Sequence, residues 1–360
     1  MSRITTISAR ELDDTLAARW REMQRQNPEL ANPYFCVDYV RAVAAVRDDV
    51  RVAVIEEDDR IVGFFPYQSA DGVVAKPVGG RLSDYQGIIG EPGRRWDHAA
   101  ILDACKLRIW DFDHLLASQA PDEIHRRIDD ASPIMDLSGG FEGYLAERKK
   151  AKAKRIDQFR RKERKFEREI GKLEVELYSR DEVAFRQVVE WKNAQCRRTG
   201  APEFLTWGWT EAMLREIWQR DSAEFAGMLT VVRVDDEIVA AHFGMRSRDV
   251  CHWWFPTYNH RFGKYSPGGI MLLKLAEAVA AEGIGQIDLG KGDDAYKPSF
   301  ANGEVALVEG SVLRPSLAAS KRRVATSMRS FLKESPVTGP LRGVYRRLKA
   351  LKRGPGRAIA

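Results

Sequence analysis

Two segments near the C-terminal end of this chain combine residue types suited to acyl-transfer chemistry. The first, residues 258–269, is a Gly-rich turn that precedes an apolar helix, with Pro267 at the expected helix start. Backbone N–H groups at a helix start are unpaired, and the helix dipole is positive there, so such a turn can hold a pyrophosphate. Pro is also favoured at the first position of ordinary helices, which is the competing interpretation.

The predicted phosphate cradle is residues 266–270. Ser266, Gly268, Gly269 and Ile270 would offer backbone N–H groups to a bound pyrophosphate, and Lys264 would add positive charge. A cation in an exposed turn is as easily explained without a ligand. The cradle is therefore a hypothesis that needs the geometry of the neighbouring elements.

The second segment, residues 286–300, reads as a short strand that ends in charged residues and a Tyr. Asp288 is the first candidate for a general base, because burial at a strand end would raise its pKa towards a useful range. An Asp that caps the following Gly-rich turn through its side chain is the alternative. Tyr296 is the candidate that would protonate a leaving thiolate.

Further candidates flank these two segments. His242 lies on a strand expected to border the bound acyl donor, and an imidazole suits proton transfer near neutrality. A lone His among apolar neighbours is, however, more often a core residue. Lys291 and Lys297 are predicted to bind the acceptor; Lys297 has the alternative of pairing with Asp293 or Asp294. We find no residue set suited to a metal, and none is predicted.

Aromatic residues cluster at 207–209 and 252–255. Aromatic faces stack on sugar rings, and alternating aromatics on a strand usually fill a core. Trp253 and Trp254 should point to opposite faces of a strand, so at most one is expected in the core. Trp254 is therefore predicted to line an acceptor groove.

The elements that position these residues follow from hydrophobic periodicity. In the N-terminal part we expect a helix over residues 1–30, strands over 51–56 and 60–67, a helix near 96–107 and a strand near 108–112. In the C-terminal part we expect a strand over 173–177, helices over 182–198 and 208–220, strands over 225–234, 237–246 and 250–256, a helix over 267–282, and strands over 286–289 and 305–313. Between them, residues 147–169 hold twelve Lys and Arg against five acids with few apolar positions, typical of a helix that bridges two units.

The order of these motifs resembles the GNAT-like acetyltransferase domain of the CelD/BcsL group, which is named for cellulose biosynthesis and is related to the FemAB aminoacyl transferases. The resemblance covers residues 145–305 and rests on the basic run, on Tyr265-Ser266-Pro267-Gly268, and on Asp288-Leu289-Gly290 with residues 296–300. The motifs at residues 32–35 and 82–85 are also similar but less specific. The usual GNAT pyrophosphate signature is met only at its first Gly.

The resemblance implies an α+β fold of tandem GNAT-like lobes, each a mixed, mostly antiparallel sheet flanked by helices. The expected units are an N-terminal lobe (1–140), a basic linking helix (141–172), the acyltransferase lobe (173–313) and a basic tail (314–360). It implies transfer of an acetyl group from acetyl-CoA to a hydroxyl or amine of a sugar precursor or exopolysaccharide. An aminoacyl-tRNA-dependent transferase and a non-catalytic scaffold of a polysaccharide-secretion system are the alternatives; nucleic acid is otherwise not an expected partner.

Composition sets the compartment we expect. The chain is 44% hydrophobic and 31% charged, its four Cys are scattered, and its first residues lack the apolar core of a secretory signal. A reducing cytoplasm is the natural setting. Residues 314–360 hold thirteen Lys and Arg against one acid, a net charge of +12 within a total of +6. Such a tail suits an anionic surface, so we expect peripheral attachment at the inner membrane; a solvated extension is the alternative.

Overall fold

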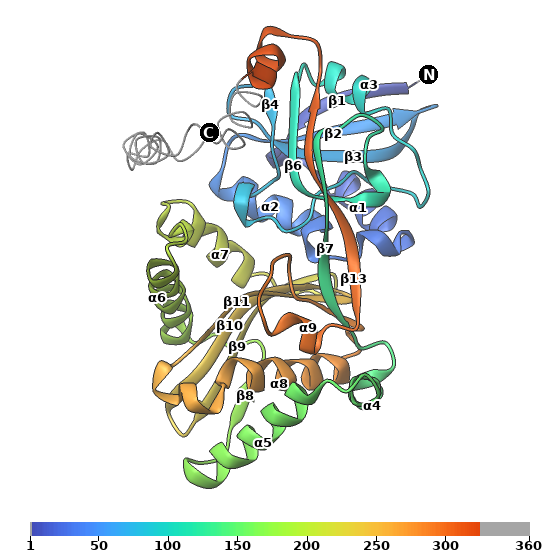
Figure 1. Cartoon of the computed structure of the whole chain (residues 1–360). Coiled ribbons are helices and arrows are strands. Elements are labelled where there is room, and N and C mark those ends of the chain that lie inside the picture. The colour runs from blue at the N-terminus through green and yellow to red at the C-terminus, as the bar shows by residue number, and fades with distance from the viewer. Residues whose placement is uncertain (1, 325–360) are drawn as a thin grey trace, which may run out of the picture.

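The computed structural model describes residues 2–324, which form two β-sheets with helices packed on their faces (Figure 1). The strands are β1 (Ser2–Ser8), β2 (Val50–Glu57), β3 (Arg60–Gln68), β4 (Val74–Ala75), β5 (Ile89–Gly90), β6 (Ile109–Leu116), β7 (His125–Asp136), β8 (Glu174–Glu176), β9 (Phe225–Val234), β10 (Glu237–Ser247), β11 (Val250–Tyr258), β12 (Gln286–Asp288) and β13 (Gly303–Leu313). The α-helices are α1 (Asp14–Gln26), α2 (Val37–Val46), α3 (His98–Ala104), α4 (Gly140–Lys150), α5 (Lys154–Glu169), α6 (Glu182–Thr199), α7 (Thr210–Trp218), α8 (Pro267–Ala281) and α9 (Lys297–Phe300).

The two sheets differ in size and in strand direction. The smaller sheet has the order β1-β2-β3-β5 and is antiparallel throughout. The larger has the order β4-β6-β13-β7-β12-β11-β10-β9-β8 and is antiparallel except for the pairs β4–β6 and β11–β12. The predicted α+β class, with mixed and mostly antiparallel sheets flanked by helices, is confirmed.

The larger sheet runs through both lobes of the molecule: the upper lobe holds α1–α3 and β1–β6, and the lower lobe holds α4–α9 and β8–β12. In Figure 1 the long strands β7 and β13 extend from the upper lobe into the lower one. β13 pairs with β6 along one edge and with β7 along the other, and β7 in turn pairs with β12. The division of the chain into units 1–140 and 173–313 remains a prediction. Backbone hydrogen bonds of β7 with β12 and of β6 with β13 join strands of both units in one sheet.

The start of the chain departs from prediction. Residues 2–8 form the edge strand β1, paired with β2, and the helix begins only at Asp14. The helical spacing of apolar residues, which begins at Leu12, was correct for α1 but does not reach the segment before it. The sequence pattern predicts no strand over 125–136, where β7 lies, because the first half of that strand is exposed and carries charged side chains.

The basic run forms two helices instead of one. α4 and α5 are separated at residues 151–153, where Lys152 has a φ of 57° that an α-helix does not accept. α5 is also more than a solvated bridge, because Phe159 and Phe166 pack into the core beneath α8. Within residues 2–324, every helix is too short or too polar to span a bilayer.

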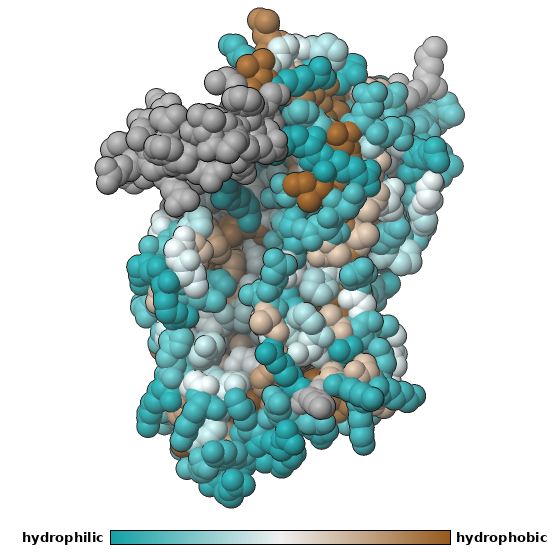
Figure 2. Space-filling view, in the orientation of Figure 1, coloured by the Kyte–Doolittle hydropathy of each residue, from teal (hydrophilic) through white to brown (hydrophobic). Residues whose placement is uncertain are grey.

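Both faces of the larger sheet are covered in the lower lobe. α8 and α5 pack on one face, while α6, α7 and the upper lobe cover the other. Trp253 and Trp254 are therefore both buried, at 4% and 8% exposure, and the expectation that one of them is exposed is wrong. The visible face in Figure 2 is mostly hydrophilic, with a hollow between the two lobes that is partly lined by hydrophobic residues beside α7.

Candidate active site

The candidate site is the point where the parallel strands β11 and β12 separate. They pair over only three positions, and the last pair is His252 with Asp288. β11 continues to Tyr258, whereas the chain after β12 turns away at Gly290, whose φ of 71° favours Gly. A register shift against β10, between Phe243 and Met245, adds a bulge to β11 at the same level. The strands thus open a gap directly beyond the His252–Asp288 pair.

Asp288 is fully buried and its carboxylate is surrounded by donors. Oδ1 accepts hydrogen bonds from Ser132 Oγ at 2.9 Å and from the Gly290 N–H at 2.8 Å. Oδ2 accepts from the Tyr85 hydroxyl and from Asn32 Nδ2, the latter at 3.4 Å. Burial disfavours the charged form, but the pKa of Asp288 is nevertheless lowered, by His252 first and then by these donors. The predicted capping contact to the turn is present, and no oxygen is left open to a substrate.

His252 lies between two carboxylates. Its Nδ1 is 3.3 Å from Asp288 Oδ1 and its Nε2 is 3.0 Å from Asp84 Oδ2. Burial lowers the pKa of this imidazole, but the two carboxylates outweigh that effect and raise it to about 9. His252 is therefore an imidazolium near neutral pH, and the three groups form the chain Asp84–His252–Asp288.

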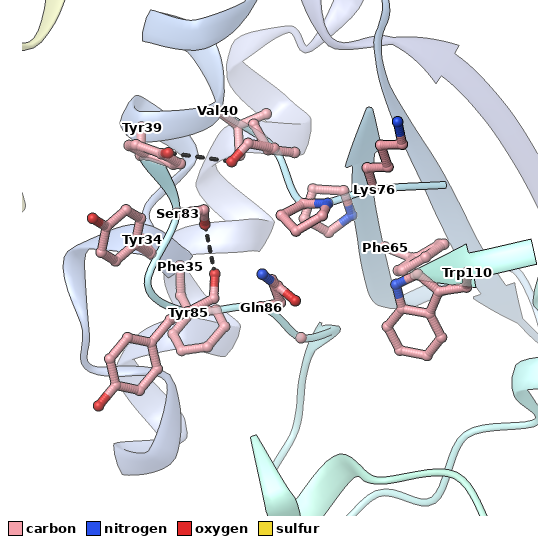
Figure 3. Close-up of a pocket in the computed structure, with 14 residues that line it drawn as sticks. Tyr34, Phe35, Tyr39, Val40, Phe65, Lys76, Ser83, Tyr85, Gln86 and Trp110 are labelled. Carbon is pink, nitrogen blue, oxygen red and sulfur yellow. Dashed lines mark hydrogen bonds between the residues drawn. The ribbon is translucent and has the colours of Figure 1, made fainter. Parts of the chain in front are cut away.

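Three residues of the upper lobe complete this network: Asn32, Asp84 and Tyr85. In Figure 3 the ring of Tyr85 projects away from Lys76 and Trp110 and carries its hydroxyl out of the small pocket drawn there. That orientation brings the hydroxyl to Asp288. The motifs at residues 32–35 and 82–85 were noted in the sequence, but no role was assigned to them, and His252 was missed; only contacts between residues far apart in the chain reveal them.

Asp84 is the exposed end of the chain of three groups. Its side chain is 26% exposed, whereas those of His252 and Asp288 are fully buried. Its second oxygen lies 3.8 Å from Nε2 of His114. Lys291, predicted to bind substrate, is paired with Asp130 at 3.2 Å. Asp84 is thus the group of the network that a ligand can reach.

His242 has a contact that suits a structural role. Its Nε2 accepts the N–H of Trp254 at 3.1 Å, a group that the bulge in β11 frees from the sheet. Burial lowers the pKa of His242 to about 3, so the ring is neutral. Gly244 permits this arrangement, because a Cβ there would lie 2.4 Å from the imidazole. The imidazole holds the bulge, and its use as a base stays a prediction.

Tyr296 packs against the cluster beneath α8, whereas His252, the partner of Asp84, packs against Tyr34 of the other cluster. Its hydroxyl accepts a hydrogen bond from Trp253 Nε1 at 3.2 Å, which leaves its own proton available to another acceptor. Burial raises the pKa of Tyr296 above its usual value. The residue is therefore suited to donating a hydrogen bond to an anion and poorly suited to full ionisation.

Lys297 closes the loop between β12 and α9. Its Nζ donates to the carbonyl oxygens of Gly290 at 3.0 Å and Lys291 at 3.1 Å, and it pairs with Asp294 at 3.0 Å. The predicted alternative, pairing with Asp294, is thus present, and three partners leave this ammonium little capacity for a substrate. A cavity of about 600 Å³ lies beside the same loop, bounded by residues 292–295 and 301–304.

Three of the four backbone N–H groups of the predicted phosphate cradle already have hydrogen-bond partners in the chain. The Ser266 N–H bonds to Gly263, and the N–H groups of Gly269 and Ile270 bond to the Ser266 carbonyl. The Gly268 N–H has no hydrogen-bond partner among residues 2–324. Lys162 of α5 reaches Ser266 Oγ at 2.7 Å.

Charge near the cradle therefore comes from α5. The predicted Lys264 is 67% exposed and lies 3.8 Å from Glu169. One free N–H and Lys162 fit a single phosphate group better than the four donors expected. Among residues 2–324, no group of three or more His, Cys, Asp or Glu side chains is arranged to hold a metal ion.

Comparison with known protein families finds a match over part of the chain. Residues 153–298 match the model of the family described as the acetyltransferase (GNAT) domain. GNAT-type acyl transfer, with an acyl-CoA as co-substrate, is the chemistry that this match supports. No curated protein matches the chain.

Solved structures share the fold at low sequence identity. FemX is 9% identical, with a TM-score of 0.53, over 82% of this chain and 94% of that one. The C-terminal DUF2156 domain of an Agrobacterium fabrum protein named as a lysylphosphatidylglycerol synthetase is 12% identical, with a TM-score of 0.50, over 88% and 97%. A tandem GNAT protein from the clavulanic acid pathway is 12% identical, with a TM-score of 0.49, over 88% and 100%. At such identities the likeness concerns the fold alone.

Proposed function

We propose that the chain transfers an acetyl group from acetyl-CoA to a hydroxyl or amine of a sugar precursor or exopolysaccharide. The observation that carries the proposal is the separation of β11 and β12 directly beyond the His252–Asp288 pair, with Asp84 at the open side. A thioester in that gap would have α8 and its Gly268 N–H on one face of the sheet. The acceptor would approach from the other face, between the lobes.

In the proposed mechanism Asp84 is the general base. As the acceptor oxygen or nitrogen attacks the thioester carbonyl carbon, its proton passes to the Asp84 carboxylate, and the carbon–sulfur bond breaks to release a thiolate. His252 orients Asp84 through its Nε2 and is itself held by Asp288. Tyr296 donates a hydrogen bond to the thiolate on the other face. Asp288 is then a positioning residue, a refinement of the first hypothesis that made it the base.

An aminoacyl-tRNA-dependent reaction is the second candidate, favoured by the basic helix α5. Arg161, Arg164, Lys165 and Arg168 are all exposed on it. Cations in such a row suit phosphate contacts. In that case tRNA would bind and acetyl-CoA would not.

The test is acetyl-CoA binding by calorimetry, followed by release of free thiol in the presence of amino sugars and polysaccharide fragments. Gly268→Asp is the informative variant, because a Cβ at Gly268 meets nothing closer than 3.6 Å and the fold should persist. Its carboxylate would repel the donor phosphates and is expected to weaken binding at least tenfold. Gly143→Asp, on the exposed face of α4, is the matched control. Failure of acetyl-CoA to bind the wild-type chain would refute the proposal.

A further inference from the structure

Helix α6 carries a cation within its buried stripe. Its buried residues include Phe185, Val188 and Cys196, which face β10 and β11. Lys192 lies four residues after Val188 and four before Cys196, so helical geometry sets it on the same stripe. A Lys on such a stripe is usually either paired with an acid or extends its ammonium towards water.

Lys192 has no such partner. Within residues 2–324 it makes no hydrogen bond and no ion pair; its Nζ lies 5.8 Å from the centre of the Phe255 ring. The residue is half-buried, and burial lowers the pKa of its ammonium, while Asp294 and Asp84 act in the opposite direction from beyond ion-pair distance. Lys192 thus has no anion within ion-pair distance among residues 2–324, although the carboxylates of Asp294 and Asp84 act on its charge from further away.

Burying a cation without a partner costs free energy, and an anionic ligand would offset that cost. The position of Lys192 indicates which substrate would bring the anion. Phe255, beneath its ammonium, belongs to the cluster on the α6 face of the sheet, whereas α8 and the Gly268 cradle belong to the cluster on the opposite face. The phosphates of the donor are thus separated from Lys192 by the sheet.

We propose that Lys192 binds an oxyanion, a carboxylate or a phosphate, of the acceptor in the space between α6 and the upper lobe. The inference rests on the proposed function and narrows it to anionic acceptors. The aromatic ring of Phe255 supports the ammonium from below by a cation–π contact. Neutral sugars would leave the cation unpaired and would be poorer acceptors.

The first experiment uses small anions as probes. Inorganic phosphate and acetate are titrated into the full-length chain and into Lys192→Met, and the melting temperature is followed. We expect stabilisation of the wild-type chain that is lost in Lys192→Met and kept in Lys172→Met, which removes an exposed Lys after α5. A larger shift with phosphate than with acetate would identify a phosphate-bearing acceptor, and the reverse a carboxylate. Equal shifts in wild type and Lys192→Met would overturn the proposal.

The second experiment separates this inference from the donor site. In Lys192→Met, acetyl-CoA affinity is expected to stay unchanged, while KM for an anionic acceptor rises at least tenfold and is partly restored in Lys192→Arg. A loss of acetyl-CoA affinity in Lys192→Met would assign the residue to the donor and overturn the inference. If the wild-type chain bound no acetyl-CoA, the proposed function would fail, whereas the anion titrations would still report on Lys192.

Discussion

His252 and Asp288 face each other at the last paired position of β11 and β12, with Nδ1 and Oδ1 3.3 Å apart and both side chains fully buried. The pair sits where two strands stop sharing hydrogen bonds. The charges of the pair lie at the edge of the gap, and Asp84, which pairs with His252, extends this row of charged groups to the exposed side. The first three predictions concern this pair and the groups that border the gap.

Asp84→Asn should lower kcat at least a hundredfold while leaving acetyl-CoA affinity unchanged, because the amide cannot take the proton of the acceptor. Asp288→Asn should lower kcat less and should also reduce stability, since it leaves the His252 charge with one carboxylate. Steady-state kinetics and calorimetry would measure both. Full activity of Asp84→Asn would remove it as the base.

The pH dependence of stability should carry the signature of His252. Its pKa is about 9 in the folded chain against 6.5 as its ordinary value, so folding binds a proton between these values. At about 1.4 kcal/mol per pH unit, the charge of His252 contributes about 3 kcal/mol to the free energy of unfolding. This contribution is complete below pH 6.5 and is lost as the pH rises through 9. Urea denaturation of wild type and His252→Gln at pH 6, 7.5 and 9 should show curves that converge as the pH rises. Parallel curves would contradict the imidazolium.

Tyr296→Phe should lower kcat by about ten- to a hundredfold, because a hydrogen bond to a developing thiolate contributes about 1.5 to 3 kcal/mol. Binding of acetyl-CoA should be unaffected. Tyr258→Phe is the control, since that residue is exposed and its hydroxyl has no hydrogen bond among residues 2–324. An unchanged rate in Tyr296→Phe would show that Tyr296 does not donate a hydrogen bond to the thiolate.

Gly269 should be intolerant of a side chain. A Cβ there would lie 2.4 Å from the Phe159 ring, so Gly269→Ala should cost about 1 to 3 kcal/mol although Ala favours helices. Gly268→Ala, where the nearest atom is 3.6 Å away, is the comparison and should be neutral or stabilising. The double variant Gly269→Ala/Phe159→Ala should cost less than the sum of its parts. Additive losses in denaturant unfolding would argue against the contact.

The predicted membrane-binding tail lies mostly outside the residues that the structure describes. Ala319 is buried and Arg322 pairs with Asp111, so the shortened chain should end after Val324 and not at Leu313 as the sequence alone suggests. We expect the full chain to sediment with anionic liposomes at low salt and the shortened one to stay in solution. Equal partitioning of the two would mark residues 325–360 as a solvated extension.

The sequence predicted the elements of the lower lobe well because each has its own periodic pattern. The strands β9, β10 and β11 and the helices α6 and α8 lie within two residues of the ranges expected. β7 was missed because its exposed charges remove the alternation that signals a strand. α4 and α5 were merged because charge density, unlike a left-handed residue such as Lys152, does not indicate where a helix breaks.

The site was predicted less well, because Asp288 meets Ser132, Tyr85 and Asn32 across 156, 203 and 256 positions of sequence. Asp288 was identified from its place at a strand end, but its partners Tyr85 and Asn32 lie in the other lobe. Lys192 carries a signal that the sequence does contain, a cation on an apolar helical stripe. This pattern indicates a binding role only once the structure shows that Lys192 has no ionic partner among residues 2–324.

The position of β13 between β6 and β7 bears on how the chain matures during synthesis. Residues 303–313 are among the last of the described chain to leave the ribosome, yet they form an inner strand of a nine-stranded sheet. Until they arrive, β6 and β7 each expose an unpaired edge, which is a template for aggregation. A premature stop between residues 136 and 303 would therefore release a product in which β6 and β7 each keep an unpaired edge, and chaperone demand should be greatest in the final seconds of translation.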